Sequence, residues 1–136
     1  MKDVLIIDKT AEIKLALTLE TFSTIEFDDE VGGLNAVGEK KPVVVLLNHN
    51  IMGERTPYYI NLLLESSVES NVIVIADTLS EPEILNCLLA GAKGYQEIGQ
   101  LNVYAGKLVT VIKAGEAWIT RRMTRILLDS LREQRI

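Results

Sequence analysis

The sequence contains little cysteine, few aromatic residues and no long apolar run. Cys87 is the only cysteine among 136 residues, so neither an internal disulfide nor a cluster of thiolate metal ligands can form. No apolar run approaches the roughly 18 residues of a membrane span, although 48% of the residues are hydrophobic. Met1 leads into a strand-like segment rather than the apolar region of a signal peptide. We therefore expect one cytoplasmic domain with a sizeable apolar core and no contact with a membrane.

Basic residues are also scarce over most of the chain. The formal net charge is −5, which argues against a surface that binds a nucleic-acid backbone. Residues 116–136 differ, because five arginines and three acidic residues give this segment a net charge of +2. The rest of the chain then has a net charge of −7. We expect a basic C-terminal helix on an acidic body, and no direct binding of nucleic acid by this chain.

A glycine-rich phosphate-binding loop is missing as well. Residues 8–13 follow the first expected strand and contain no glycine and one hydroxyl side chain. Nucleotide- and flavin-binding proteins with parallel sheets cradle phosphate on backbone N–H groups of a loop rich in glycine or hydroxyl residues. A flavodoxin-like nucleotide-binding protein is therefore the least favoured of three functional interpretations, and we expect no cofactor.

Short apolar runs alternate with segments of helical period, which is typical of an α/β fold with a parallel sheet. The expected strands are residues 4–8, 24–28, 43–47, 71–76 and 94–98. Residues 24–28 alternate between apolar and polar and so favour an edge, whereas the first, third and fourth strands are almost continuously apolar. Right-handed crossovers then predict a flavodoxin-like, five-stranded parallel sheet of order 2-1-3-4-5 with helices on both faces.

Helix boundaries are marked by capping residues. Thr56 and Pro57 predict a cap and a first-turn proline, and Ser80 with Glu83 predicts a capping box. A single stripe of apolar residues predicts a fifth helix that Gly115 ends. The residues of this stripe are Ala105, Leu108, Val109 and Ile112.

An extra helix, capped by Thr120, is expected after the five that this sheet requires. We divide the chain into a domain of residues 1–115 and a C-terminal linker helix within residues 116–136. The apolar stripe of this helix consists of Ile119, Met123, Ile126, Leu127 and Leu131. If these side chains do not all pack against the body, they predict pairing with another copy, so we expect a homodimer.

Two stretches carry a resemblance to a known family. Residues 42–53 read Pro-Val-Val-Val-Leu-Leu-Asn-His-Asn-Ile-Met-Gly, and residues 90–95 read Ala-Gly-Ala-Lys-Gly-Tyr. Both resemble the CheY-like receiver domain of two-component response regulators of the LuxR/NarL type. Residues 115–119 are similar to the segment that leads out of such receivers. The resemblance implies a module that once preceded, or still precedes in the intact protein, a helix-turn-helix DNA-binding domain; no such segment lies within residues 1–136.

The resemblance implies five functional positions in the phosphorelay. Receivers of this family place an acidic pair for Mg²⁺ after the first strand, a phosphate-accepting aspartate after the third, a hydroxyl after the fourth and a lysine after the fifth. The corresponding residues here are Asp8, Lys9, Asn48, Ala76 and Ile98. Only Asp8 is retained.

The replacements remove the chemistry of phosphoryl transfer. The amide of Asn48 cannot form an acyl phosphate, and Asp8 next to the ammonium group of Lys9 is a poor site for Mg²⁺. Ala76 cannot donate a hydrogen bond, and Ile98 cannot pair with phosphate. We expect a degenerate pseudo-receiver without catalytic residues or metal, which is not an enzyme and acts through protein–protein interaction. The alternative is a conventional receiver that a histidine kinase phosphorylates at another residue.

Two side chains leave alternatives open at this stage. Lys9 either reaches the cleft, to neutralise Asp8 or donate to the side-chain oxygen of Asn48, or extends into solvent. The resemblance implies that an aromatic residue at position 95 turns inward on phosphorylation. Because Ala76 lacks a hydroxyl, Tyr95 is either held inward permanently or is a partly exposed packing residue.

Overall fold

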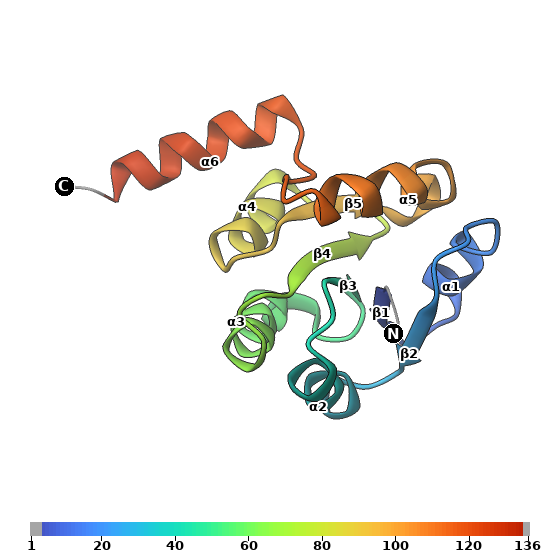
Figure 1. Cartoon of the computed structure of the whole chain (residues 1–136). Helices are drawn as coiled ribbons and strands as arrows, with labels where there is room; N and C mark the ends of the chain where they lie inside the picture. Colours follow the sequence, from blue (N-terminus) through green and yellow to red (C-terminus); the bar gives the residue numbers. More distant parts are fainter. Residues whose placement is uncertain (1–3, 135–136) are drawn as a thin grey trace.

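The computed structural model describes residues 4–134, which form a five-stranded parallel sheet covered by helices (Figure 1). The strand order is β2-β1-β3-β4-β5. The strands are β1 (Val4–Ile7), β2 (Thr24–Phe27), β3 (Val44–Asn48), β4 (Asn71–Ala76) and β5 (Gly94–Glu97). The predicted flavodoxin-like fold and strand order are therefore confirmed, and β2 lies at an edge as its alternating pattern indicates.

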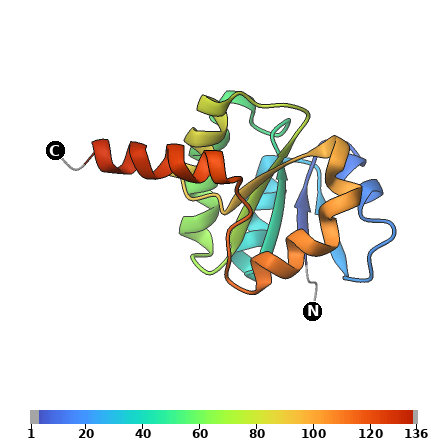
Figure 2. The same ribbon diagram turned by 90° about the horizontal axis from the view of Figure 1, so that it is seen from above.

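The helices form two layers, one on each face of the sheet. They are α1 (Glu12–Ala16), α2 (Glu30–Lys40), α3 (Thr56–Ser66), α4 (Glu81–Leu89), α5 (Ile98–Lys113) and α6 (Arg121–Glu133), with a 3₁₀ turn, η1 (Gly53–Arg55), before α3. Helices α1 and α5 lie on one face and α2, α3 and α4 on the other (Figures 1 and 2). The extra helix α6 is present, packs against α4 and projects past the body. None of the described helices is long and apolar enough to cross a membrane.

The core consists of two apolar clusters separated by the sheet. Leu5 and Ile7 of β1 face the cluster under α2, α3 and α4, whereas Val4 and Ile6 face the cluster under α1 and α5. All four side chains are buried, because successive residues of a strand point to opposite faces and both faces are covered. Burial of each such side chain contributes roughly 1.5–3 kcal/mol of transfer free energy.

Two of the three predicted helix starts are confirmed. Ser80 and Glu83 form the capping box of α4, and the hydroxyl of Thr120 accepts a hydrogen bond of 3.1 Å from the backbone N–H of Met123. The predicted cap at Thr56 is wrong, because this residue already lies within the first turn of α3. Its hydroxyl instead donates to the backbone oxygen of Gly53 in η1, at 2.6 Å.

Strand ends differ from the predicted ones by single residues. Asn48 is the last residue of β3 rather than the residue after it, because its pairing with Ile75 of β4 extends the ladder. Ile98 begins α5 instead of ending β5. Helix α5 ends two residues before Gly115, whose φ of 88° is a left-handed conformation suited to glycine. The predicted division after residue 115 thus falls beyond the end of α5, and its status as a domain boundary stays a prediction.

Residues 116–120, which we call the edge segment, add a short strand-like contact to the free edge of β5. Trp118 forms a parallel bridge with Gly94. Its backbone N–H donates to the oxygen of Lys93 at 2.9 Å, and its backbone oxygen accepts from the N–H of Tyr95 at 3.2 Å. Its indole N–H also donates to the side-chain oxygen of Gln96 at 3.0 Å. The edge segment therefore fixes where α6 leaves the body.

Candidate functional site

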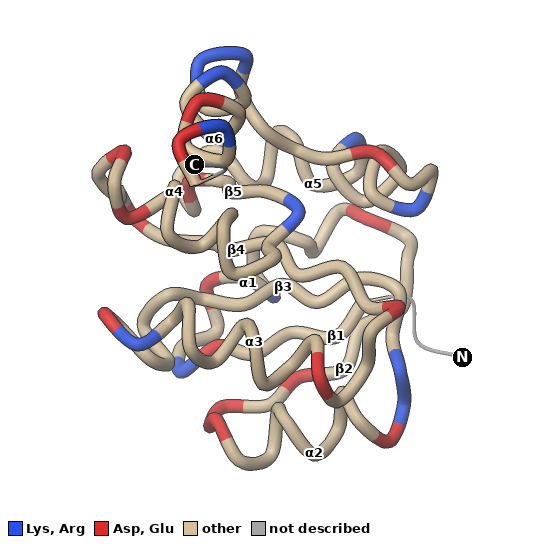
Figure 3. Tube along the Cα trace, turned by 90° about the vertical axis from the view of Figure 1, so that its left-hand side faces the viewer, with Lys and Arg blue, Asp and Glu red and all other residues tan. Residues whose placement is uncertain are grey.

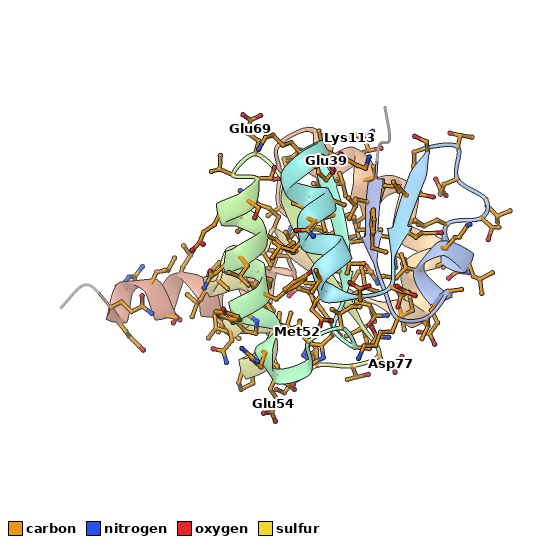
Figure 4. The ribbon with its side chains drawn as sticks, turned by 90° about the horizontal axis from the view of Figure 1, so that it is seen from below. Glu39, Met52, Glu54, Glu69, Asp77 and Lys113 are labelled. Carbon is orange, nitrogen blue, oxygen red and sulfur yellow. The ribbon has the colours of Figure 1, made fainter. Side chains whose placement is uncertain are left out.

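The register of the sheet brings Asp8 and Asn48 together. Ile7 of β1 pairs with Leu47 of β3, so the residues that follow them are neighbours at the carboxyl ends of the two strands. Ligands of open parallel sheets bind at this end, where the strand order reverses. Figure 4 shows Met52 and Asp77, which follow β3 and β4, at this end of the sheet. The candidate site therefore lies between β1 and β3.

The carboxylate of Asp8 is buried, with 4% of the residue exposed, and receives five hydrogen bonds. Its Oδ1 accepts from the side-chain amide of Asn48 at 3.0 Å and, more weakly, from that of Asn50 at 3.4 Å. The backbone N–H and the hydroxyl of Thr10 each donate to the same oxygen at 3.0 Å. The backbone N–H of Ile13 donates to Oδ2 at 3.1 Å. Neutral donors thus stabilise the buried negative charge.

Asn48 connects the two loops of the site. While its Nδ2 donates to Asp8, its Oδ1 accepts a 3.0 Å hydrogen bond from the backbone N–H of Asn50. The side chain is itself buried, and its NH₂ group donates to one loop while its carbonyl oxygen accepts from the other. Both contacts require the same orientation of the amide, so Asn48 holds the loop after β1 and the loop after β3 in a single arrangement.

Lys9 forms neither of the expected contacts in the cleft. The residue is exposed, and among the described residues its ammonium group makes no hydrogen bond or ion pair with Asp8 or Asn48. Its side chain instead lines a cavity of about 420 Å³ between the loop after β1 and strand β2, together with Lys14 and Glu26. The hypothesis that Lys9 replaces a metal ion is therefore wrong, because amide and hydroxyl donors already surround the Asp8 carboxylate.

The residues at this site do not fit the Mg²⁺ ion that the receiver resemblance implies. Mg²⁺ is usually held by one or two carboxylates together with phosphate oxygens and water. Asp8 supplies the carboxylate here, and its oxygens are engaged by protein donors. Within residues 4–134, no three His, Cys, Asp or Glu side chains lie together as metal ligands. Asn48 also directs its NH₂ group, not its carbonyl oxygen, toward Asp8, and an NH₂ group cannot act as a metal ligand.

The ends of β4 and β5 place apolar side chains near the site. Ala76 is the buried last residue of β4 and pairs with Glu97. Ile98 is half-buried and packs against the cluster under α1 and α5. The hydroxyl of Thr78 donates to the backbone oxygen of Asp77 at 2.7 Å and does not join Asp8. The structure therefore brings Asp8 and Asn48 together, but adds neither a hydroxyl donor nor a cation to them.

Tyr95 is half-buried and packs against the cluster under α2, α3 and α4. Its hydroxyl oxygen accepts a 3.2 Å hydrogen bond from the backbone N–H of Leu79, in the loop that follows β4. Burial is the main cause that raises the pKa of the phenol, and the hydrogen bond from Leu79 opposes it. Tyr95 therefore connects β5 to the loop between β4 and α4 while packing beneath that helix.

Sequence reasoning missed Thr10 and Asn50 as partners of Asp8. Both lie two residues beyond a polar residue at a strand end, a spacing at which Asp and Asn side chains accept hydrogen bonds from the backbone. The pairs Asp8–Thr10 and Asn48–Asn50 thus carry a turn signal that could have identified them. Their convergence on one carboxylate depends on the pairing of β1 with β3.

No protein-family model and no curated protein sequence matches this chain. Solved structures do match it. The isolated receiver (REC) domain of RcsB from Salmonella enterica serovar Typhimurium, in its apo form, superposes with a TM-score of 0.78 at 16% identity, over 93% of this chain and 98% of that one. A LuxR-family two-component response regulator from Aurantimonas sp. SI85-9A1 gives 0.75 at 13% identity, over 93% and 95%.

A longer RcsB structure from Salmonella typhimurium, described in terms of its interaction with DNA, gives a TM-score of 0.74 at 16% identity. The match covers 93% of this chain and 66% of that one. At identities this low, the superpositions establish the fold alone. The strand order and the two helical layers of this chain agree with that fold. The chain therefore has the CheY-like fold that these receiver domains share.

Proposed function

We propose that this chain is a regulatory module with a receiver fold that works without phosphorylation and without enzymatic activity, through contacts with other proteins. The observation that carries the proposal is the hydrogen bond between the side-chain amide of Asn48 and the carboxylate of Asp8. In a phosphorylatable receiver this place requires a nucleophilic carboxylate and a divalent cation. Here the amide satisfies the only buried carboxylate of the described site without either.

The hydrogen-bonding pattern supports a single state of the site. A switch needs two arrangements of similar free energy that a ligand or modification stabilises differently. Asp8 and Asn48 make their contacts within the chain, and no side-chain polar atom buried within the described residues lacks a partner. An arriving phosphoryl group would meet neither a hydroxyl at Ala76 nor a cation at Ile98. The proposed output is therefore constitutive.

The position of α6 supports a role for the C-terminal part in that output. Met123 is buried in the cluster under α2, α3 and α4, while the edge segment pairs with β5. The longer RcsB structure, whose description refers to DNA interaction, extends beyond the part that matches this chain. By analogy we propose that α6 transmits the fixed state of the receiver to a DNA-binding domain in the intact protein or to a partner.

Intact-mass measurement after incubation with acetyl phosphate and Mg²⁺ tests the absence of phosphorylation. We expect no added phosphate on the chain as it stands, and none on Asn48→Asp, because Lys9, Ala76 and Ile98 remain. The matched control is the fourfold variant Lys9→Asp, Asn48→Asp, Ala76→Thr and Ile98→Lys, which restores every missing group and on which we expect phosphate.

Two outcomes would contradict the proposal. Acyl phosphate on the single variant Asn48→Asp would mean that the other three replacements matter little. Phosphate that is added to the unaltered chain and persists in Asn48→Ala would instead support a conventional phosphorelay receiver that uses another residue. Far-UV circular dichroism of each variant excludes loss of the fold as the cause of a negative result.

A further inference from the structure

A cavity of about 490 Å³ lies between α5, β5 and the edge segment. It is lined by Tyr104 of α5, Tyr95 of β5 and Trp118 of the edge segment, so three elements each contribute an aromatic ring. The ring centroids of Tyr104 and Trp118 are 6.2 Å apart, and the two ring planes are inclined at 54°. The volume is within the usual range of small-molecule sites, and one ligand can contact more than one ring.

The charge of this cavity is negative. Glu97 is the one charged residue among the described residues that line it. Its carboxylate accepts a long hydrogen bond of 3.4 Å from the hydroxyl of Thr78, and within residues 4–134 it forms no ion pair. Elsewhere, acidic and basic residues both occur along the helices and loops (Figure 3). The cavity therefore combines aromatic rings with a carboxylate that no lysine or arginine of its described lining neutralises.

Another exposed ring, that of Tyr58 in α3, has a cation from within the chain. The guanidinium carbon of Arg55 lies 5.2 Å from the centroid of this ring, which is within the range of a cation–π interaction. Among the described residues that line the cavity, no lysine or arginine takes the corresponding place over Tyr104 or Trp118. The rings of the cavity are therefore available to a cation from outside the chain.

We propose that this cavity binds a small organic cation whose ammonium group carries methyl groups. Its charge would be attracted to the ring faces and to the carboxylate of Glu97, while its methyl groups pack against Val111 and Ile119, which also line the cavity. A bare ammonium group is more strongly hydrated and would lose more on leaving water. Glu97 would repel an anion, and a divalent metal ion would find a single carboxylate as ligand.

The cavity is separate from the site of Asp8 and Asn48. That site lies between β1 and β3, whereas β4 stands between β3 and β5 in the sheet. Because α5, β5 and the edge segment all contribute lining residues, a bound cation would hold the edge segment on β5. The proposal goes beyond the interaction role proposed above and uses different residues, so the failure of either one would leave the other standing.

The fluorescence of Trp118, the only tryptophan, tests binding to the whole chain. The probes are choline and tetramethylammonium, and sodium chloride at equal concentration corrects for ionic strength. We expect a saturable change with both probes. The neutral carbon analogue of choline, in which a quaternary carbon replaces the nitrogen, should bind at least about fivefold more weakly. Absence of a saturable change with both probes, or equally tight binding of the neutral analogue, overturns the proposal.

Substitutions locate the bound cation. We expect Tyr104→Leu to weaken choline binding about two- to fivefold, because one ring face is lost. Glu97→Gln should weaken it by up to about fivefold, since solvent screens this exposed carboxylate. Tyr58→Leu and Glu54→Gln are the matched controls at exposed positions of α3 and η1, and should leave choline binding unchanged. If Tyr104→Leu and Glu97→Gln bind choline no more weakly than these controls, while circular dichroism shows that all four are folded, the proposed site is refuted.

Discussion

The side-chain amide of Asn48 donates a 3.0 Å hydrogen bond to the buried carboxylate of Asp8, 40 residues earlier in the chain. The two residues meet because β1 and β3 are neighbours in register, and each residue stands at the carboxyl end of its strand. The contact joins the two loops that form the mouth of the sheet. It replaces the repulsion expected between two carboxylates at this place with a charge-assisted hydrogen bond.

Removal of this contact should destabilise the domain. We expect Asn48→Ala to lower the free energy of unfolding by about 1.5–3 kcal/mol, because a buried carboxylate loses a close donor. Urea unfolding measures the change, and an unaltered m-value would show that the unfolded state is the same. The control is Asn50→Ala, which removes a longer contact of 3.4 Å to the same oxygen and should cost less. Equal losses of stability in the two variants would show that Asn48 stabilises the Asp8 carboxylate no more than Asn50 does.

Gly94 should be essential for docking of the edge segment. A Cβ atom at this position would lie 2.3 Å from the backbone oxygen of Trp118 and 2.8 Å from its Cβ, so Gly94→Ala should displace the edge segment from β5. Trp118 is the only tryptophan, and its fluorescence should shift to longer wavelength. Gly99→Ala is the matched control, because nothing lies within 4 Å of a Cβ atom there. An unchanged spectrum for Gly94→Ala would show that the edge segment is not held by this contact.

Cys87 should react slowly with thiol reagents in the native protein. Burial, assisted by the negative charge of Glu83, raises the pKa of the thiol from 9.0 to about 11. At neutral pH this lowers the reactive thiolate fraction roughly a hundredfold, before any steric protection. Absorbance with a disulfide reagent should show fast reaction only in urea. As a control, Leu19→Cys in a Cys87→Ser background, at an exposed site, should react at once. Similar native rates for the two thiols would refute the prediction.

The capping box of α4 should make stability depend on pH in the acid range. Hydrogen bonds from the backbone and then the side chain of Ser80 lower the pKa of Glu83 below its ordinary value of 4.5. The stabilisation is therefore present above about pH 4.5 and is lost as the pH falls through the lower folded-state value. Urea unfolding at several pH values should show that Glu83→Gln costs stability at neutral pH and progressively less in acid.

Glu54→Gln provides the comparison for this pH series. Glu54 is exposed in η1, and within the described part of the chain its side chain forms no hydrogen bond or ion pair. Its replacement should change stability little at any pH. A cost for Glu83→Gln that stays constant down to acid pH would show that the carboxylate charge does not contribute through the cap.

The fold could be predicted from local patterns because each of its elements is specified by nearby residues. Val4–Ile7 and Val44–Leu47 are apolar at every position, which a strand requires when both of its faces are covered. The capping box at Ser80 and the cap at Thr120 are likewise short-range signals. The cap expected at Thr56 failed because the preceding 3₁₀ turn places that residue inside the helix, and this turn has no strong local signal.

The sequence by itself determined the parallel sheet, its order and the absence of a carboxylate nucleophile at Asn48, since residue identity settles which groups can react. Only the tertiary structure decided what Asp8 binds. Lys9 is adjacent in sequence, yet the donors come from Thr10, Ile13, Asn48 and Asn50. The register of β1 and β3 places two of these donors, Asn48 and Asn50, beside Asp8 although they lie 40 or more residues away in the sequence. A neutral amide can donate to the buried carboxylate there, whereas a lysine would have to bury its own charge. The pairing of Trp118 with Gly94 has the same origin, because it depends on an exposed strand edge that exists only after the sheet has formed.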